Sequence, residues 1–154
     1  MTLTKEEPRN LDVRPFQAVI DTCVIVSAVR SRKGASFRLL SLLGDPRWQF
    51  NLSAPLVFEY EDALRRIPPE LRAGDDAIDE LIDSICAVGN HRTIYFLWRP
   101  ALPDPSDDFV LELAVESESD CIITYNRRHF KGAETFGLAV VTPVEFLRLI
   151  GEIS

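Results

Sequence analysis

The stretch FQAVIDTCVIVSAVRS, residues 16–31, decides the class of fold. Its first part, FQAVID (16–21), is a short apolar run that closes on an acid and is typical of a buried strand. Its second part, TCVIVSAVRS (22–31), has the apolar spacing of a helix rather than that of an alternating strand. A buried strand that passes directly into a helix is the repeating unit of α/β proteins.

The same succession continues along the chain. Apolar runs rich in β-formers predict further strands, and residues at helical spacing predict the helices between them. The predicted strands are 48–54, 93–98, 120–125 and 138–142, and the predicted helices include 36–44, 53–67, 75–89 and one that opens at Thr142 with a capping box. Alternating strands and helices predict an α/β fold with a mostly parallel sheet.

The composition fits one domain. At 154 residues, with 46% hydrophobic and 27% charged, the chain can bury a full core, and we expect a polar leader over 1–15 before a single domain over 16–154. No apolar run approaches the ~20 residues of a membrane span, and the leader lacks the apolar centre of a signal peptide. Three isolated cysteines, Cys23, Cys86 and Cys121, suit a reducing compartment and a core position. We therefore expect a cytoplasmic location.

The net charge of −7 argues against a protein that coats nucleic acid nonspecifically, since that mode relies on Lys and Arg. It does not exclude a nuclease, because metal-binding acids lower the net charge while cations neutralise them locally. Three basic clusters remain, and each alone is typical of a solvated patch: RSRK at 30–33, Arg65–Arg66 and NRRH at 126–129.

Acids crowd the start of one predicted helix, in DPSDDFVLELA (104–114). Capping explains much of this: Asp104 is a good N-cap, Pro105 suits the first helical position, and Asp107 falls where a capping-box acid sits. Capping does not explain the face that Asp107 occupies, because this acid shares the apolar stripe of the helix. That stripe comprises Asp107, Val110, Leu111 and Ala114, whereas we expect Asp108, Glu112 and Glu116 to face solvent.

Further acids and an amide stand at informative places. Asp21 and Asn126 each follow a predicted strand, and ligands bind beyond the carboxyl ends of strands in such sheets. Asp21 could equally cap the helix that begins near Thr22. Glu59 flanks the apolar stripe of the 53–67 helix, where solvated carboxylates are also common.

Three carboxylates on separate elements predict a site for a hard divalent cation if they converge. Mg²⁺ and Mn²⁺ prefer oxygen ligands, and such a site can activate water for attack on phosphorus. The sequence has no HExxH, GxxxxGK[ST], GxGxxG or GxSxG motif. His91 and His129 have no ligand-like spacing, and we expect His129 to be a surface residue.

With these stretches in view, the chain resembles the PIN domain family, in particular the bacterial and archaeal branch of toxins from toxin–antitoxin pairs. The resemblance covers about residues 17–148 and is carried by AVIDTCVIVSAV, LSAPLVFEYEDALRR, DPSDDFVLELAVESESDCIITYNRRHF and VVTPVEFL. It implies an α/β/α sandwich, Mg²⁺- or Mn²⁺-dependent cleavage of RNA, frequent homodimers, and a small antitoxin that blocks the site.

By position, the resemblance implies that Asp21, Glu59 and Asp107 bind the metal ion. Asn126 matches a fourth position that is often aspartate, and Thr124 matches a Ser or Thr that could orient water or phosphate. Behind these ligands the resemblance places Asp104 and the residue at Cys23, where the family usually has Asn. Both Cys23 and Asn126 depart from the family pattern. Five basic residues could contact RNA phosphates: Arg30, Arg32, Lys33, Arg127 and Arg128.

Other interpretations stay open. A catalytically degenerate PIN module that binds RNA or protein is motivated by Cys23 and Asn126. A haloacid-dehalogenase-type phosphatase needs a second Asp where Cys23 stands. A response-regulator receiver needs an acid pair near the first strand and a Lys after the last, and VIDT and VVTP supply neither.

Overall fold

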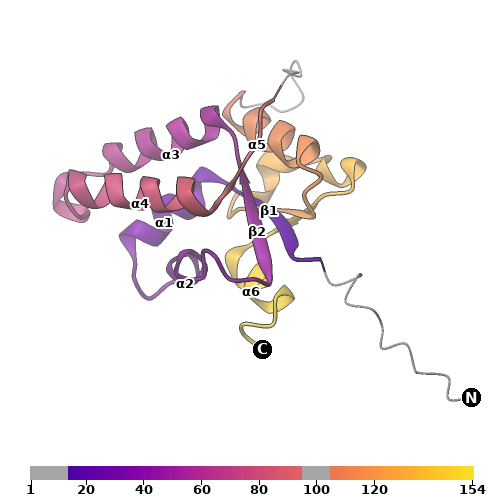
Figure 1. Ribbon diagram of the computed structural model, residues 1–154, viewed down its shortest axis with the longest axis horizontal. Coiled ribbons are helices and arrows are strands. Elements are labelled where there is room, and N and C mark those ends of the chain that lie inside the picture. Colours follow the sequence, from indigo (N-terminus) through magenta and orange to yellow (C-terminus); the bar gives the residue numbers. More distant parts are fainter. Residues whose placement is uncertain (1–13, 95–104) are drawn as a thin grey trace, which may run out of the picture.

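The computed structural model describes residues 14–94 and 105–154, and the strands within them form one sheet (Figure 1). All neighbouring strands are parallel, in the order β3-β2-β1-β4-β5. The strands are β1 (Phe16–Ile20), β2 (Trp48–Leu52), β3 (Asn90–His91), β4 (Cys121–Ile123) and β5 (Ala139–Val141). The predicted α/β fold with a parallel sheet is confirmed.

The connections are helical, and their ends follow the predicted capping chemistry. The Ser53 hydroxyl accepts the amide of Leu56, and the Thr142 hydroxyl accepts the amide of Glu145. The helices are α1 (Thr22–Arg30), α2 (Ala35–Ser41), α3 (Ala54–Arg66), α4 (Asp75–Val88), α5 (Pro105–Glu116) and α6 (Pro143–Leu149). Short 3₁₀ turns are η2 (Pro69–Leu71), η3 (Arg127–Phe130) and η4 (Ala133–Phe136). In the described residues no helix has the length and apolarity to span a membrane.

The strand order places helices on both faces of the sheet. The chain moves from β1 to β3 in one direction and then returns to β4 on the other side of β1, so right-handed crossovers put α5 on the face opposite α1 to α4. Helix α6 lies on the first face, where the Phe146 ring packs edge-on against Trp48 at 5.2 Å between ring centroids. The direction of winding reverses between β1 and β4.

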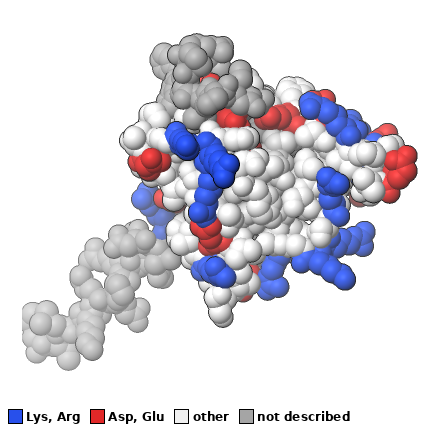
Figure 2. Space-filling model, turned by 180° about the vertical axis from the view of Figure 1, so that it is seen from behind, with Lys and Arg blue, Asp and Glu red and all other residues white. Residues whose placement is uncertain are grey.

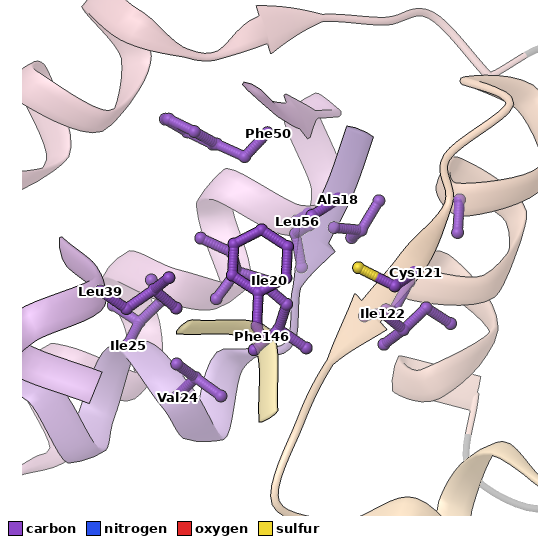
Figure 3. Packing of buried hydrophobic residues seen from close by; sticks show 14 of the residues in the cluster. Ala18, Ile20, Val24, Ile25, Leu39, Phe50, Leu56, Cys121, Ile122 and Phe146 are labelled. Carbon is purple, nitrogen blue, oxygen red and sulfur yellow. The ribbon is translucent and has the colours of Figure 1, made fainter. Parts of the chain in front are cut away.

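One cluster of buried hydrophobic residues holds these layers together (Figure 3). Ile20, Leu39 and Phe146 come from β1, α2 and α6 and are almost completely buried. Ile25 and Leu39 belong to the same cluster, and in the close view Cys121 points its sulfur into the apolar interior. The thiol of Cys121 is thus a core group, as expected of an isolated cysteine.

The strand predicted at 93–98 falls largely outside the described residues, because 95–98 lie in the gap. Residues 92–94 are irregular, and the strand that pairs with β2 is β3, Asn90–His91. Asn90 pairs with Asn51 and His91 with Leu52, directly after α4 ends. A strand at 90–91 was not predicted.

The solvent side predicted for α5 is wrong in part. Asp108 is 6% exposed and Glu112 is 4% exposed, whereas Glu116 is exposed as predicted. Asp107 and the apolar residues of its stripe are buried, also as predicted. Helix α5 contacts β1, β2 and β4 as well as α3 and η3, so neighbours enclose more than one side of it. An acid at a nominally outward position is therefore buried as well.

Candidate active site

The candidate site lies where the winding of the sheet reverses, at the carboxyl ends of β1 and β4. In open parallel sheets this switch point is where ligands bind, because the flanking helices diverge there. Asp21 follows β1 and Thr124 follows β4, and the Asp21 amide donates to the Ile123 carbonyl at 2.9 Å. The sheet itself therefore sets these two residues side by side.

Asp21 performs the capping role that the sequence left open, and its second oxygen makes further contacts. Its Oδ1 accepts the Thr22 amide at 2.9 Å, which caps α1. Its Oδ2 accepts the Thr124 hydroxyl at 2.7 Å and the Cys23 thiol at 3.4 Å. Asp21 is 7% exposed, and capping alone does not require these two side-chain donors on Oδ2.

Thr124 is completely buried and connects the two strand ends. Its hydroxyl donates to Asp21 and accepts the backbone amide of Asn126 at 2.9 Å. A hydroxyl that accepts the amide two residues on turns the chain sharply. This hydrogen bond holds the backbone of Asn126 next to Thr124. The residue Asn126 is solvent-exposed. The predicted pairing of Thr124 and Asn126 beside Asp21 has a physical basis in this turn.

Cys23 stands at the start of α1 with its sulfur directed at the same carboxylate. Burial, together with the nearby Asp21 charge, raises the pKa of the Cys23 thiol to about 11. The group is thus a neutral thiol at pH 7, able to donate weakly to Asp21 Oδ2. It orders the carboxylate as a hydrogen-bond donor.

Tyr60 is a residue of this region that the sequence reasoning placed only in the core. Its hydroxyl donates to the carbonyl of Ile20, the residue just before Asp21. Burial raises the pKa of Tyr60, and the charges of Asp21 and Glu59 raise it further, so both carboxylates lie within electrostatic range of this hydroxyl. Tyr60 thereby fastens α3, which carries half-buried Glu59, to the end of β1. The sequence does contain a signal for this role of Tyr60, because the hydroxyl of a tyrosine in a buried helix stripe needs a hydrogen-bond partner.

Asp107 stands at the start of α5 and contacts the loop after β4. Nδ1 of His129, on η3, lies 3.3 Å from Asp107 Oδ2. His129 is half exposed, as expected of a surface residue, yet it also touches the predicted metal ligand. The spacing of Asp107 and His129 in the sequence does not predict that they are in contact.

The described residues show no preformed metal site. Within 14–94 and 105–154, no three side chains of His, Cys, Asp or Glu come together so as to hold a metal ion. Both Asp21 oxygens accept hydrogen bonds, and His129 lies against Asp107. The three-carboxylate site of Asp21, Glu59 and Asp107 stays a prediction, and Asp104 lies outside the described residues. The donors are carboxylate and hydroxyl oxygens, which suit Mg²⁺ or Mn²⁺ better than softer metals.

The predicted RNA-contacting residues are solvent-exposed and lie on two segments. Arg30, Arg32 and Lys33 stand at the end of α1 and in the loop after it, and Arg127 and Arg128 stand on η3. Arg127 forms an ion pair with Glu145 of α6. On the face shown in Figure 2, Lys and Arg side chains form separate groups around a mostly uncharged centre.

One comparison with known proteins is informative. Residues 17–128, more than half of the chain, match the family model described as PIN domain. The matched range includes β1 to β4 and every residue predicted for the site. No curated protein matches the chain.

Proposed function

Because the chain belongs to the PIN domain family, whose members are generally nucleases that use divalent metal ions, we propose that it is a Mg²⁺- or Mn²⁺-dependent endoribonuclease. The observation that carries the proposal is the buried carboxylate of Asp21 at the switch point of the sheet, held by the Thr124 hydroxyl at 2.7 Å. A buried carboxylate that only capped a helix would not need this second donor.

The carboxylates of Asp21, Glu59 and Asp107 would hold the ion, with Asn126 and Thr124 beside them. When bound, the ion activates water and neutralises charge that develops at phosphorus. The chain's own contribution is orientation: Thr124 and Cys23 fix Asp21 Oδ2, and Tyr60 fixes the backbone just before it. This arrangement holds a charged group still in a largely buried place, where its electrostatic effect is strong.

Toxin action is the biological role we propose within this class. The partners would then be a target RNA, a second copy of the chain, and a small antitoxin that blocks the carboxylates, all in the cytoplasm. The Asp21 carboxylate supports this part of the proposal, since a basic side chain could pair with it.

The test is cleavage of labelled RNA by purified protein in Mg²⁺ or Mn²⁺, beside EDTA and Asp21→Asn. We expect EDTA to abolish cleavage and Asp21→Asn to reduce it by more than about 100-fold, since even groups behind metal ligands cost 10- to 100-fold when altered. Asp62→Asn is the matched control, because Asp62 is an exposed carboxylate on α3. Equal cleavage by Asp21→Asn and Asp62→Asn would assign the activity to another site or a contaminating nuclease.

A second candidate is a catalytically degenerate module that binds RNA or protein. Two observations favour it: the neutral thiol of Cys23 at the family's Asn position, and the lack of a three-ligand group in the described residues. Calorimetric titration with Mn²⁺ distinguishes the candidates. Binding that Asp21→Asn abolishes supports the nuclease, whereas a folded protein that takes up no Mn²⁺ supports the degenerate module.

A further inference from the structure

Two basic segments that are far apart in the sequence meet beside the candidate active site. The Ser36 hydroxyl, at the start of α2, lies 2.6 Å from the Tyr125 hydroxyl, and 89 positions separate these residues. Arg32 and Lys33 stand just before Ser36, while Arg127 and Arg128 follow Tyr125. Tyr125 thus lies between two basic clusters, each of which alone is typical of a solvated patch.

Tyr125 is unusual because its hydroxyl is anchored while its residue is 45% exposed. Ser36, which anchors it, is 1% exposed and is therefore a fixed partner. An aromatic side chain that served only the core would be buried more completely. Here one end of the ring is held in place while much of the residue stays accessible to solvent.

An open cavity of about 500 Å³ lies at this ring. Its lining comprises Tyr125, Asn126, Arg127, Arg128, His129 and Thr142. A second cavity, of about 420 Å³, has Arg32 and Lys33 in its lining on the α2 side. Both volumes are in the range of small-ligand sites, and the first offers an aromatic ring together with cations.

The basic residues around the Tyr125 ring differ in whether they already take part in an ion pair. Arg127 is paired with Glu145. Among the described residues, Arg128 and Lys33 take part in no ion pair, so each can meet a phosphate without breaking an existing contact. One such cation follows Tyr125 in sequence and the other lies across the Ser36 contact.

We propose that Tyr125 is the base-stacking platform of a single-stranded RNA subsite, with Arg128 and Lys33 at phosphates on its two sides. This inference rests on the proposed nuclease function. Stacking on an aromatic ring requires an unpaired base, because the bases of a duplex already stack on each other. Thr124, the residue before Tyr125, hydrogen-bonds to Asp21, so a nucleotide stacked on Tyr125 lies next to the candidate active site.

The experiment measures binding of a fluorescent 12-nucleotide single-stranded RNA to the Asp21→Asn protein in EDTA, by anisotropy. Adding Tyr125→Ala should raise Kd by roughly 5- to 150-fold, the loss of one stacked base. Tyr125→Phe retains the ring, so its Kd should stay within about twofold of the Kd of the Asp21→Asn protein. Phe58→Ala is the matched control, because Phe58 is an exposed aromatic residue on α3.

Salt dependence tests the two phosphate positions. Lys33→Ala and Arg128→Ala should each reduce the slope of log Kd against log salt by about 0.7, as expected for one contact to a single strand. Thermal unfolding of each variant checks the fold, and Tyr125→Leu, which also lacks the ring, replaces the Ala variant if that one unfolds. A duplex of the same length should bind without dependence on Tyr125.

The outcomes separate this inference from the proposed function. If wild-type protein cleaves RNA and Tyr125→Ala leaves RNA binding unchanged, the stacking platform is wrong and the nuclease stands. If wild-type protein cleaves no RNA while binding still depends on Tyr125, the nuclease is wrong and the RNA subsite stands. Absence of measurable RNA binding, or an equal loss with duplex, overturns the stacking platform.

Discussion

Two polar clusters lie in the same sheet and are built from different chemistry. The first, which we call the acidic pocket, consists of the Asp21 carboxylate and the Cys23 and Thr124 side chains that donate to it. The amide network, which extends across β1, β2 and β3 to the chain before β4, consists of Gln17, Gln49, Asn51, Asn90 and Ser119. One cluster contains ionisable groups, and the other consists of neutral amides and a hydroxyl.

The side chains of the amide network form hydrogen bonds with one another. Asn51, which is completely buried, donates to Ser119 at 3.1 Å and to Gln17 at 3.2 Å, and it accepts from Arg92 at 3.3 Å. Neutral groups that match one another favour one strand register and offer little to a ligand. In the acidic pocket, neutral donors surround a carboxylate whose charge is still available to a cation. We therefore expect alterations in the pocket to change activity and alterations in the network to change stability.

Among changes to the groups that surround Asp21, the largest effect should come from Thr124→Val, which keeps the shape of the side chain but removes the hydroxyl. Asp21 Oδ2 then loses its shortest donor, and the Asn126 amide loses its acceptor. We expect RNA cleavage to fall by about 10- to 100-fold, as when a group that orients a metal ligand is lost. The measurement is kcat/KM for RNA cleavage, with stability followed by urea unfolding.

Thr124→Ser is the matched control, since it retains the hydroxyl and should keep most of the activity. Val and Ser variants with the same loss of cleavage would show that packing at this position matters and that the hydrogen bond to Asp21 does not. Such a result would remove the distinction between the two clusters.

The sequence predicted the sheet because strands and helices depend on local patterns. Strand and helix periods and caps such as Ser53 and Thr142 act within a few residues. Asp21 was picked out because it follows a strand at the edge where ligands bind, whereas Thr124 was named only through the resemblance to the PIN domain family. Contacts between distant segments left no local signal: His129 against Asp107, and Ser36 against Tyr125. The burial of Glu112 was missed because periodicity identifies one apolar face and cannot show how many neighbours enclose a helix.

A smaller effect, on stability alone, is expected from Asn51→Leu. The change removes two donated hydrogen bonds and leaves the buried Ser119 hydroxyl with one partner fewer. We expect a loss of about 1–3 kcal/mol in the free energy of unfolding, the range for polar groups left unpaired. Cleavage per folded molecule should stay within twofold of wild type, on the order of the experimental error. Gln49→Ala is the control, because Gln49 is exposed and should cost little. A large loss of activity in the folded Asn51→Leu protein would show that the two clusters are coupled.

The smallest effect separates the clusters by pH. Cys23 has a pKa of about 11 in the folded protein against an ordinary value of 9.0, with burial as the main cause. Below pH 9 the thiol is protonated in both states and its contribution to stability is complete. Between pH 9 and 11 the unfolded chain loses this proton first, so stability falls as pH rises.

Raised pKa values of Cys121 and Tyr60 act in the same direction, so the comparison must be between variants. The urea midpoint of Cys23→Ser should therefore fall less steeply over this window than that of wild type. Asn51→Leu removes no titratable group, and its curve should run parallel to wild type at every pH. A Cys23→Ser curve that is also parallel would mean that burial of this thiol beside Asp21 contributes nothing to the stability of the pocket.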